Sequence, residues 1–162
     1  PLELAIKYNK INLVKNMLNS NLNLNLNWYD EKNNRFNPLI YACENDLTDM
    51  AILLLNTKKV EINVLEPEQN WTPLMYAVSN NNEEIVSCLV KNRECKLDRV
   101  DLVYGNTALH LAVENECSDL IIKLLCENSQ SLNSIRNKEN KTALDIAKEN
   151  ESEDLIKLLN CS

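Results

Sequence analysis

Glycine and histidine are almost absent from this chain of 162 residues, which contains one of each, Gly105 and His110. A phosphate-binding loop needs several glycines, because its backbone has to approach the phosphate closely. Zinc sites combine Cys and His at short spacings, and none of the six cysteines lies within four residues of another. We therefore expect no metal ion and no cofactor.

Basic residues are also few. Lys and Arg number 17 against 24 Asp and Glu, which gives a formal net charge of −7. Binding to nucleic acid requires clustered Lys and Arg to neutralise phosphates, so we expect no nucleic-acid partner. A protein or peptide with basic and apolar groups suits the charge of the chain better.

Long apolar runs are missing as well. No run is long enough to span a bilayer, and no charged-then-apolar leader of the secretory type is recognisable. The cysteines then fit small buried side chains in a reducing compartment. We expect an intracellular, cytoplasmic protein without membrane insertion.

What the chain does contain is one short phrase, repeated five times. It reads PLELA at 1–5, PLIYA at 38–42, PLMYA at 73–77, ALHLA at 108–112 and ALDIA at 143–147. The first residue of each copy, its anchor, follows the previous anchor after 37, 35, 35 and 35 residues. A fixed period of this length indicates a solenoid of stacked units.

Each unit is predicted to begin with a capped helix. In the third unit Thr72 is a suitable N-cap, and Pro73 fits the first helical position because its missing N–H costs nothing there. Equivalent caps in the other units are Asn37, Thr107 and Thr142. These first helices should end at asparagines that adopt the left-handed conformation, namely Asn45, Asn80, Asn115 and Asn150.

A second helix and a loop complete the unit. Its apolar face is predicted at Ile85, Val86, Leu89 and Val90 in the third unit, and at Leu120, Ile121, Leu124 and Leu125 in the fourth. Truncation of Leu109 or Leu124 to Ala should cost about 2–5 kcal/mol. A polar loop follows, with Asn70, Gly105 and Asn140 suited to positive φ in tight turns.

The segments Thr107 to Ala112 (TALHLA) and Thr72 to Ala77 (TPLMYA) resemble the T-P-L-H-x-A signature of ankyrin repeats. The five registered copies extend this resemblance across the chain. It implies an all-α ankyrin-repeat solenoid of about five helix-turn-helix units with protruding finger loops, forming a single domain over residues 1–162. The units are expected near 1–34, 35–69, 70–104, 105–139 and 140–162.

Two features depart from the family pattern. The family's glycine between the two helices is replaced by Asn9, Asp46, Asn81, Glu116 and Glu151, and each replacement should cost a little stability in a left-handed site. In the last unit Lys148 and Asn160 stand where other units carry apolar residues, which is typical of a C-terminal cap with a solvated outer face. The first unit is expected to be truncated at its start.

Candidate catalytic groups are few. His110 is the only side chain suited to act as a general base at neutral pH, but the resemblance implies structural hydrogen bonds near the cap threonine. Asp98 and Asp101 are close enough in sequence to be considered as a pair of acids, and we interpret them as solvated loop charges. We expect no enzyme activity.

Binding is the more promising function. The resemblance places partner contacts on a concave surface made by the finger loops and the first helices. By register, the predicted protein-binding residues are Phe36, Glu44, Glu68, Gln69, Trp71, Val103, Tyr104, Asn106 and Glu114. The same positions in other units hold Lys7, Asn33, Asn34, Ser79, Lys138, Glu139, Lys141 and Glu149.

The aromatic members of this set allow two interpretations. Phe36, Trp71 and Tyr104 would line up across three units as rigid interface anchors with a charged rim. Alternatively, they brace one finger against the next.

The first finger contains a separate pattern. Leu22, Leu24, Leu26 and Trp28 alternate with asparagines, which is typical of a half-buried strand. The alternative is low-complexity filler over residues 19–27.

Together these patterns predict a monomeric protein–protein interaction module, an adaptor or scaffold, whose partner is a protein or peptide with basic and apolar groups. The alternative is a regulatory ankyrin domain of a larger enzyme, channel or ubiquitin-pathway protein, with an intramolecular ligand.

Overall fold

The computed structural model describes residues 1–20, 24–28 and 37–160. Within these residues the chain forms ten α-helices, one short 3₁₀ helix and no strand. The helices are α1 (Leu2–Lys7), α2 (Ile11–Asn19), α3 (Pro38–Glu44), α4 (Thr48–Asn56), α5 (Pro73–Ser79), α6 (Glu83–Val90), α7 (Ala108–Glu114), α8 (Asp119–Asn128), η1 (Gln130–Ser134), α9 (Ala143–Glu149) and α10 (Glu153–Asn160). The all-α prediction is confirmed.

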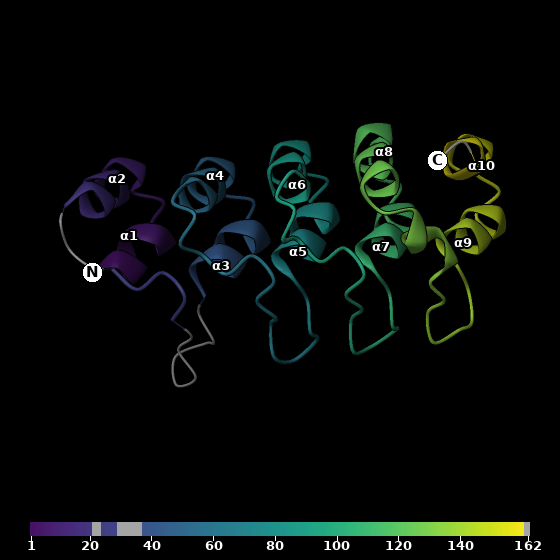
Figure 1. Cartoon of the computed structure of the whole chain (residues 1–162), viewed down its shortest axis with the longest axis horizontal. Helices are drawn as coiled ribbons and strands as arrows, with labels where there is room; N and C mark the ends of the chain where they lie inside the picture. Colours follow the sequence, from purple (N-terminus) through teal and green to yellow (C-terminus); the bar gives the residue numbers. More distant parts are fainter. Residues whose placement is uncertain (21–23, 29–36, 161–162) are drawn as a thin grey trace.

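The helices form five pairs that stand side by side in a single row (Figure 1). The first helices α1, α3, α5, α7 and α9 pack against one another in sequence, and the second helices α2, α4, α6, α8 and α10 form a parallel row above them. Loops extend away from the first-helix row on the side opposite the second helices. This is the predicted solenoid with protruding fingers.

The predicted N-caps start the first helices. The side chain of Asn37 accepts hydrogen bonds from the Leu39 and Ile40 amides, and Thr72 accepts from Met75 N–H at 3.2 Å. Thr142 and Asp145 form a reciprocal capping box. Each cap satisfies backbone donors that the first turn leaves without an intrahelical partner, so these helices begin at fixed residues.

The left-handed residue of each helix-helix turn lies one position later than predicted. Asn45, Asn80, Asn115 and Asn150 have negative φ, between −93° and −77°, so the prediction for them is wrong. Positive φ of 49° to 55° occurs instead at the positions of the missing family glycine, namely Asn9, Asp46, Asn81, Glu116 and Glu151. Asn70, Gly105 and Asn140 have positive φ as predicted. The non-glycine residues in these sites carry a steric cost that glycine would avoid.

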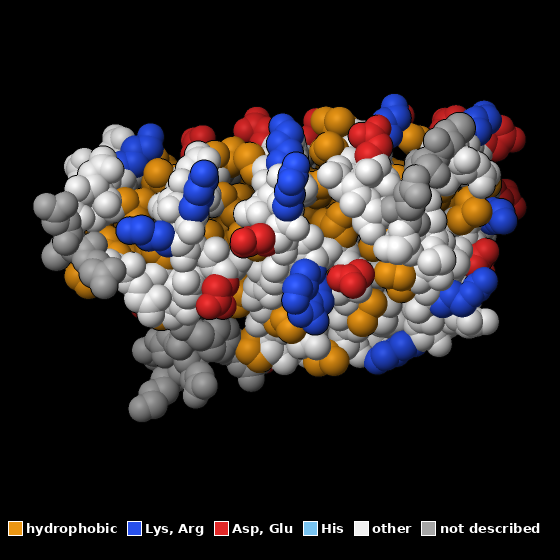
Figure 2. Space-filling view, viewed as in Figure 1, with side chains coloured by type: hydrophobic (Ala, Val, Ile, Leu, Met, Phe, Trp, Pro, Cys, Tyr) orange, Lys and Arg blue, Asp and Glu red, His pale blue; other side chains and the backbone are white. Residues whose placement is uncertain are grey.

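Small residues let the first helices approach closely. Ala42, Ala77, Ala112 and Ala147 are all fully buried, and they occupy the same place in successive units. Larger residues such as Leu74 and Leu109 fill the space between the two helix rows. On the face shown in Figure 2, apolar side chains are visible in the furrows between units, and charged side chains stand outside them. The core is thus continuous from unit to unit.

The buried face of α8 differs from the prediction by one residue. Ile121, Ile122, Leu125 and Cys126 are buried, whereas Leu120 is 47% exposed and Leu124 is half-buried. The cause lies in the preceding turn: Cys117 extends it by one residue, and the N-cap moves to Ser118. Because a helix turns by about 100° per residue, a start one position later rotates its apolar face away from the predicted residues.

The alternating Leu pattern does not form a strand over residues 24–28, which the structure describes. Leu26 is buried in the core and Leu24 and Trp28 pack against it, so the interpretation as filler is wrong for these residues too. Leu22 lies outside the described residues.

Candidate interaction surface

Three described fingers project beside the first helices, and together they form what we term the finger face: fingers 66–71, 101–106 and 137–141 with helices α3, α5, α7 and α9. Each finger is closed by a backbone hydrogen bond across its base. These bonds join Glu66 to Trp71, Asp101 to Asn106 and Asn137 to Lys141, at 2.8–2.9 Å. A closed loop of this kind presents its tip in one conformation.

Neighbouring fingers are also bonded to each other. The Leu102 amide donates to the Gln69 carbonyl, and the Lys138 amide donates to the Tyr104 carbonyl, each at 2.8 Å. Lys138 Nζ donates to the Leu102 carbonyl as well. These bonds tie three fingers into one ribbon, so little ordering is required when a partner docks.

Asp101 was predicted to be a solvated charge, and that prediction is wrong. Its side chain is 3% exposed and accepts hydrogen bonds from the backbone N–H groups of Tyr104, Gly105 and Asn106 at 2.6–3.2 Å. It therefore holds the turn of the third finger. Asp98 is exposed, as predicted.

Trp71 lies at the junction of the second finger and its helix. It is half-buried, and its ring meets that of Tyr76 on α5 edge to face, with centroids 5.0 Å apart. Edge-to-face pairs of this geometry are favourable beyond the area that they bury. Trp71 thus contacts the helix of its own unit, and sequence reasoning missed Tyr76 as the other half of this aromatic pair.

Asn106 occupies the same register as Trp71 in the next unit but is buried, with 1% of its side chain exposed. Its Nδ2 donates to both carboxylate oxygens of Glu114 at 2.9 and 3.0 Å, and its Oδ1 accepts from Asn137. A direct contact between the Asn106 side chain and a partner is therefore contradicted by its burial. Its role in the structure is to position Glu114 and to join two fingers.

The third finger exposes a compact apolar tip. Val103 and Tyr104, both predicted, are 51% and 58% exposed, and sequence reasoning missed their equally exposed neighbours Val100 and Leu102. The signal was visible in the sequence, because four apolar residues between 100 and 104 are unusual in a loop that should be polar. Four such side chains on one loop form an apolar patch rather than isolated exposed residues.

Acidic side chains accompany the aromatic and apolar groups. Glu44 and Glu114 are exposed at the ends of α3 and α7, and Glu68 and Gln69 are exposed on the second finger. Partial burial raises the pKa of Glu44, and the nearby Glu66 charge raises that pKa further. Burial likewise raises the pKa of Glu114, with Asp101 and Glu139 adding to the rise while Asn106 and Lys141 oppose it. A cation brought to this face would relieve the repulsion.

The last described finger has a different charge pattern. Lys141 forms ion pairs with Glu139 at 2.9 Å and with Glu149 at 2.7 Å, and these partners raise the pKa of Lys141. The predicted residues Phe36, Asn33 and Asn34 lie outside the described residues. The structure therefore brings Trp71, Glu44, Glu68, Gln69, Val103, Tyr104 and Glu114 to one face, with Asn106 beneath them.

His110 makes structural hydrogen bonds, as predicted. Its side chain is fully buried, and Nδ1 accepts from the Thr107 amide at 3.2 Å. The other ring nitrogen, Nε2, lies 3.1 Å from the Lys141 carbonyl, to which it donates when the neutral ring carries its proton there. Burial lowers the pKa of His110 more than the backbone of Lys141, the charge of Asp101 and the backbone of Ile135 raise it.

The lowered pKa predicts a pH dependence of stability. In the folded protein the pKa of His110 lies below its unfolded value of about 6.5. The contribution of His110 to the free energy of unfolding is therefore fully present above that pH, and it is lost as the pH falls through the folded pKa. His110→Gln should cost about 1–3 kcal/mol at pH 7 through the lost bonds. The difference in unfolding free energy between the wild type and His110→Gln should shrink towards pH 5. Urea unfolding of the two proteins at pH 7, 6 and 5 measures this difference. A difference that stays constant over this range would contradict the prediction.

Other chemical sites are not evident in the part of the chain that the structure describes. Among these residues no group of three or more His, Cys, Asp or Glu side chains could hold a metal ion. Burial raises the pKa of the Cys43 and Cys117 thiols, and that of Cys95 to about 11, so these thiols stay protonated. No described helix combines the length and apolar character required to cross a membrane.

Two comparisons with known proteins bear on this arrangement. A family profile described as ankyrin repeats (3 copies) matches residues 2–101 and again residues 93–162. No curated protein matches the chain. The two matches to the profile together cover nearly all of the sequence.

Proposed function

The chain belongs to the ankyrin repeat family, a general protein–protein interaction module, and from this premise we propose that its finger face binds a peptide or domain carrying both basic and apolar groups. The observation that carries the proposal is the juxtaposition of the Trp71–Tyr76 pair, the apolar tip of the third finger and a set of carboxylates on fingers already bonded to one another. Preformed aromatic anchors with a charged rim are typical of interfaces.

Charge supports the basic character of the partner. Residues 64–80 and 100–114, which supply the second and third fingers and helices α5 and α7, contain no Lys or Arg. Their acids and Glu44 therefore give this part of the finger face a negative potential. Such a field speeds the approach of a basic partner and disfavours polyanions such as nucleic acids.

The same proposal includes a division into five units, near 1–34, 35–69, 70–104, 105–139 and 140–162, with the last as a cap. The five helix pairs, one first helix and one second helix in each, support the division into units. We also propose that the chain works as a monomer.

Trp71→Ala should weaken binding of such a partner by about 2 kcal/mol or more. The same change should lower the free energy of unfolding by less, about 1 kcal/mol, because Trp71 is half-buried and loses its contact with Tyr76 and part of its packing against the core. The measurement is fluorescence anisotropy with basic and apolar peptides selected on the immobilised chain from a random phage library.

Tyr8→Ala is the matched control, because Tyr8 is 70% exposed and lies at the end of α1, away from the second and third fingers. It should leave affinity for the selected peptides unchanged. Equal losses of affinity and stability in Trp71→Ala would assign Trp71 a structural role. If none of the selected peptides depended on Trp71 for binding, the proposed function would be refuted.

A further inference from the structure

The positive charge of the middle units is confined to two loops. Every Lys and Arg between residues 36 and 122 belongs to a set that we term the basic edge: Lys58, Lys59, Lys91, Arg93, Lys96 and Arg99. The first two residues lie in the loop after α4, and the other four lie in the longer loop after α6. All six side chains are exposed.

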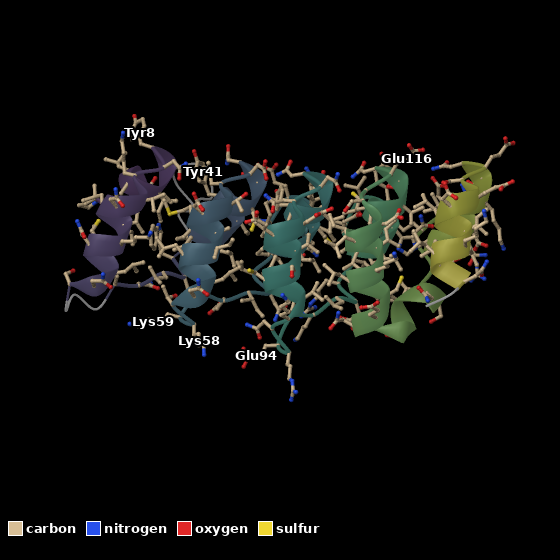
Figure 3. All side chains as sticks on the ribbon, turned by 90° about the horizontal axis from the view of Figure 1, so that it is seen from above. Tyr8, Tyr41, Lys58, Lys59, Glu94 and Glu116 are labelled. Carbon is tan, nitrogen blue, oxygen red and sulfur yellow. The ribbon has the colours of Figure 1, made fainter. Side chains whose placement is uncertain are left out.

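The basic edge lies on the other side of the molecule from the ends of the first helices. Figure 3 shows Lys58, Lys59 and Glu94 along one edge, and Tyr41 and Glu116 along the opposite edge. In Figure 2, Lys and Arg side chains stand in front of the α4 and α6 regions, with apolar side chains between them. The basic edge therefore lies opposite the edge that carries Tyr41 and Glu116.

A groove with an apolar floor runs between the two loops. It has a volume of about 720 Å³, and its lining combines four apolar side chains with three cations, two amides and one acid: Leu55, Val60, Ile62, Cys88, Lys58, Lys91, Arg93, Asn56, Asn92 and Glu94. None of the six cations forms an ion pair within the described residues, although Glu61, Glu94 and Asp98 also lie on these loops. The charges are thus available to a ligand and outnumber the local acids.

The loops are held in place by asparagine side chains. Asn27 donates to the Lys59 carbonyl and accepts from the Glu61 amide, both at 2.7 Å. Asn63 repeats this pattern one unit later, donating to the Glu94 carbonyl and accepting from the Lys96 amide, both at 2.8 Å. The cations therefore extend from braced backbone, and a ligand need not order the loops.

We propose that the basic edge is a second docking surface, which binds an acidic peptide segment with apolar side chains in the groove between the loops after α4 and α6. The apolar floor accommodates the apolar side chains, and the unpaired cations on the rim match the carboxylates. A polyanion without apolar groups would leave the floor empty. The chain would then join a basic partner on the finger face to an acidic partner on the opposite edge.

Fluorescence anisotropy with a designed probe tests this proposal. The probe is a fluorescein-labelled helical peptide with Leu at positions i, i+3, i+4 and i+7 and Glu at the other positions, so that one face is apolar and the rest acidic. Two further peptides isolate its features: one replaces every Glu with Lys, and the other replaces every Leu with Ser. The acidic, apolar probe should bind, and each altered peptide should bind at least about tenfold more weakly.

Charge reversal then locates the site. Lys58→Glu, Lys91→Glu and Arg93→Glu together should weaken probe binding at least about tenfold in 0.15 M salt, where distant charges are screened. The matched control reverses the charges of Lys10, Lys123 and Lys148 in the same way. These side chains are also exposed, and the two triple variants have the same net charge. Because all these side chains are exposed, both variants should keep the unfolding transition of the wild type. Equal loss in both variants would mean a general charge effect and would overturn the proposal.

Two further outcomes are decisive. Bound probe should slow the alkylation of Cys88 by N-ethylmaleimide, since Cys88 lines the groove and is half-exposed. Trp71→Ala should leave probe binding unchanged, which separates this surface from the finger face. Any of four results would overturn the proposal: alkylation that the probe does not slow, loss of probe binding in Trp71→Ala, tighter binding of a single-stranded oligonucleotide, or dimerisation of the chain through this edge.

Discussion

Replacing Leu125 with Ala is expected to lower the free energy of unfolding by about 2–5 kcal/mol, whereas the same change at the adjacent Leu124 should cost only about 1 kcal/mol. Leu125 is fully buried between α8 and its neighbours, and its truncation leaves a cavity that a packed core cannot close. Leu124 is half-buried, so water fills part of the space that its side chain vacates. Leu109, fully buried on α7, should behave like Leu125.

Chemical denaturation of the three variants measures these costs. The contrast between neighbours on one helix is informative because helix propensity and chain position are nearly identical for both. If Leu124→Ala were the costlier change, α8 would have the rotation predicted by the repeat register rather than the one observed. Because units of a solenoid are stabilised by their neighbours, the fully buried variants should still unfold in one transition with adjacent units.

Asp101→Ala should lower the free energy of unfolding by about 2–4 kcal/mol, because one carboxylate satisfies three backbone donors in the third finger. Without it the Tyr104, Gly105 and Asn106 amides lose their acceptor, and the bond that links Leu102 to Gln69 is no longer supported. The finger tip should therefore lose its fixed conformation. Faster hydrogen exchange at these amides, together with the change in unfolding free energy, measures this loss.

Asp98→Ala is the matched control, since Asp98 is an exposed acid three residues earlier in the same loop. Its removal should change stability by less than about 0.5 kcal/mol. Asp101→Asn keeps one acceptor oxygen and should fall between the two alanine variants. A similar cost for both alanine variants would show that Asp101 acts only through its charge and not through the three hydrogen bonds.

Much of the helical framework could be predicted because its signals are local. Asn37, Thr72, Thr107 and Thr142 accept hydrogen bonds from amides two or three residues away, so their capping role is visible in a short stretch of sequence. The same holds for Pro73 at a helix start and for Gly105 in a turn. Five copies in register then made the stacking evident.

The candidate surface was less predictable, because exposure depends on the path of each loop as well as on residues from other units. Asp98 and Asp101 look alike in the sequence, yet one is solvated and the other buried, since only Asp101 faces the inside of the finger turn. Asn106 and Trp71 share a register, but Asn137 from the next finger covers Asn106. In the sequence, Asn27 and Asn63 do not differ from the other asparagines of an Asn-rich chain, and only the structure shows their bonds to the following unit.

The sequence by itself determined the period, the helix starts and the row of stacked units, because each of these follows from contacts within one unit that recur in every copy. Only the tertiary structure decided which side of α8 is buried, which finger residues reach solvent and how the charges divide between two opposite edges. The physical reason is distance along the chain. The exposure of finger residues depends on neighbours about 35 residues away, such as Asn137 beside Asn106. The rotation of α8 comes from one extra turn residue at Cys117, which leaves the repeat period unchanged.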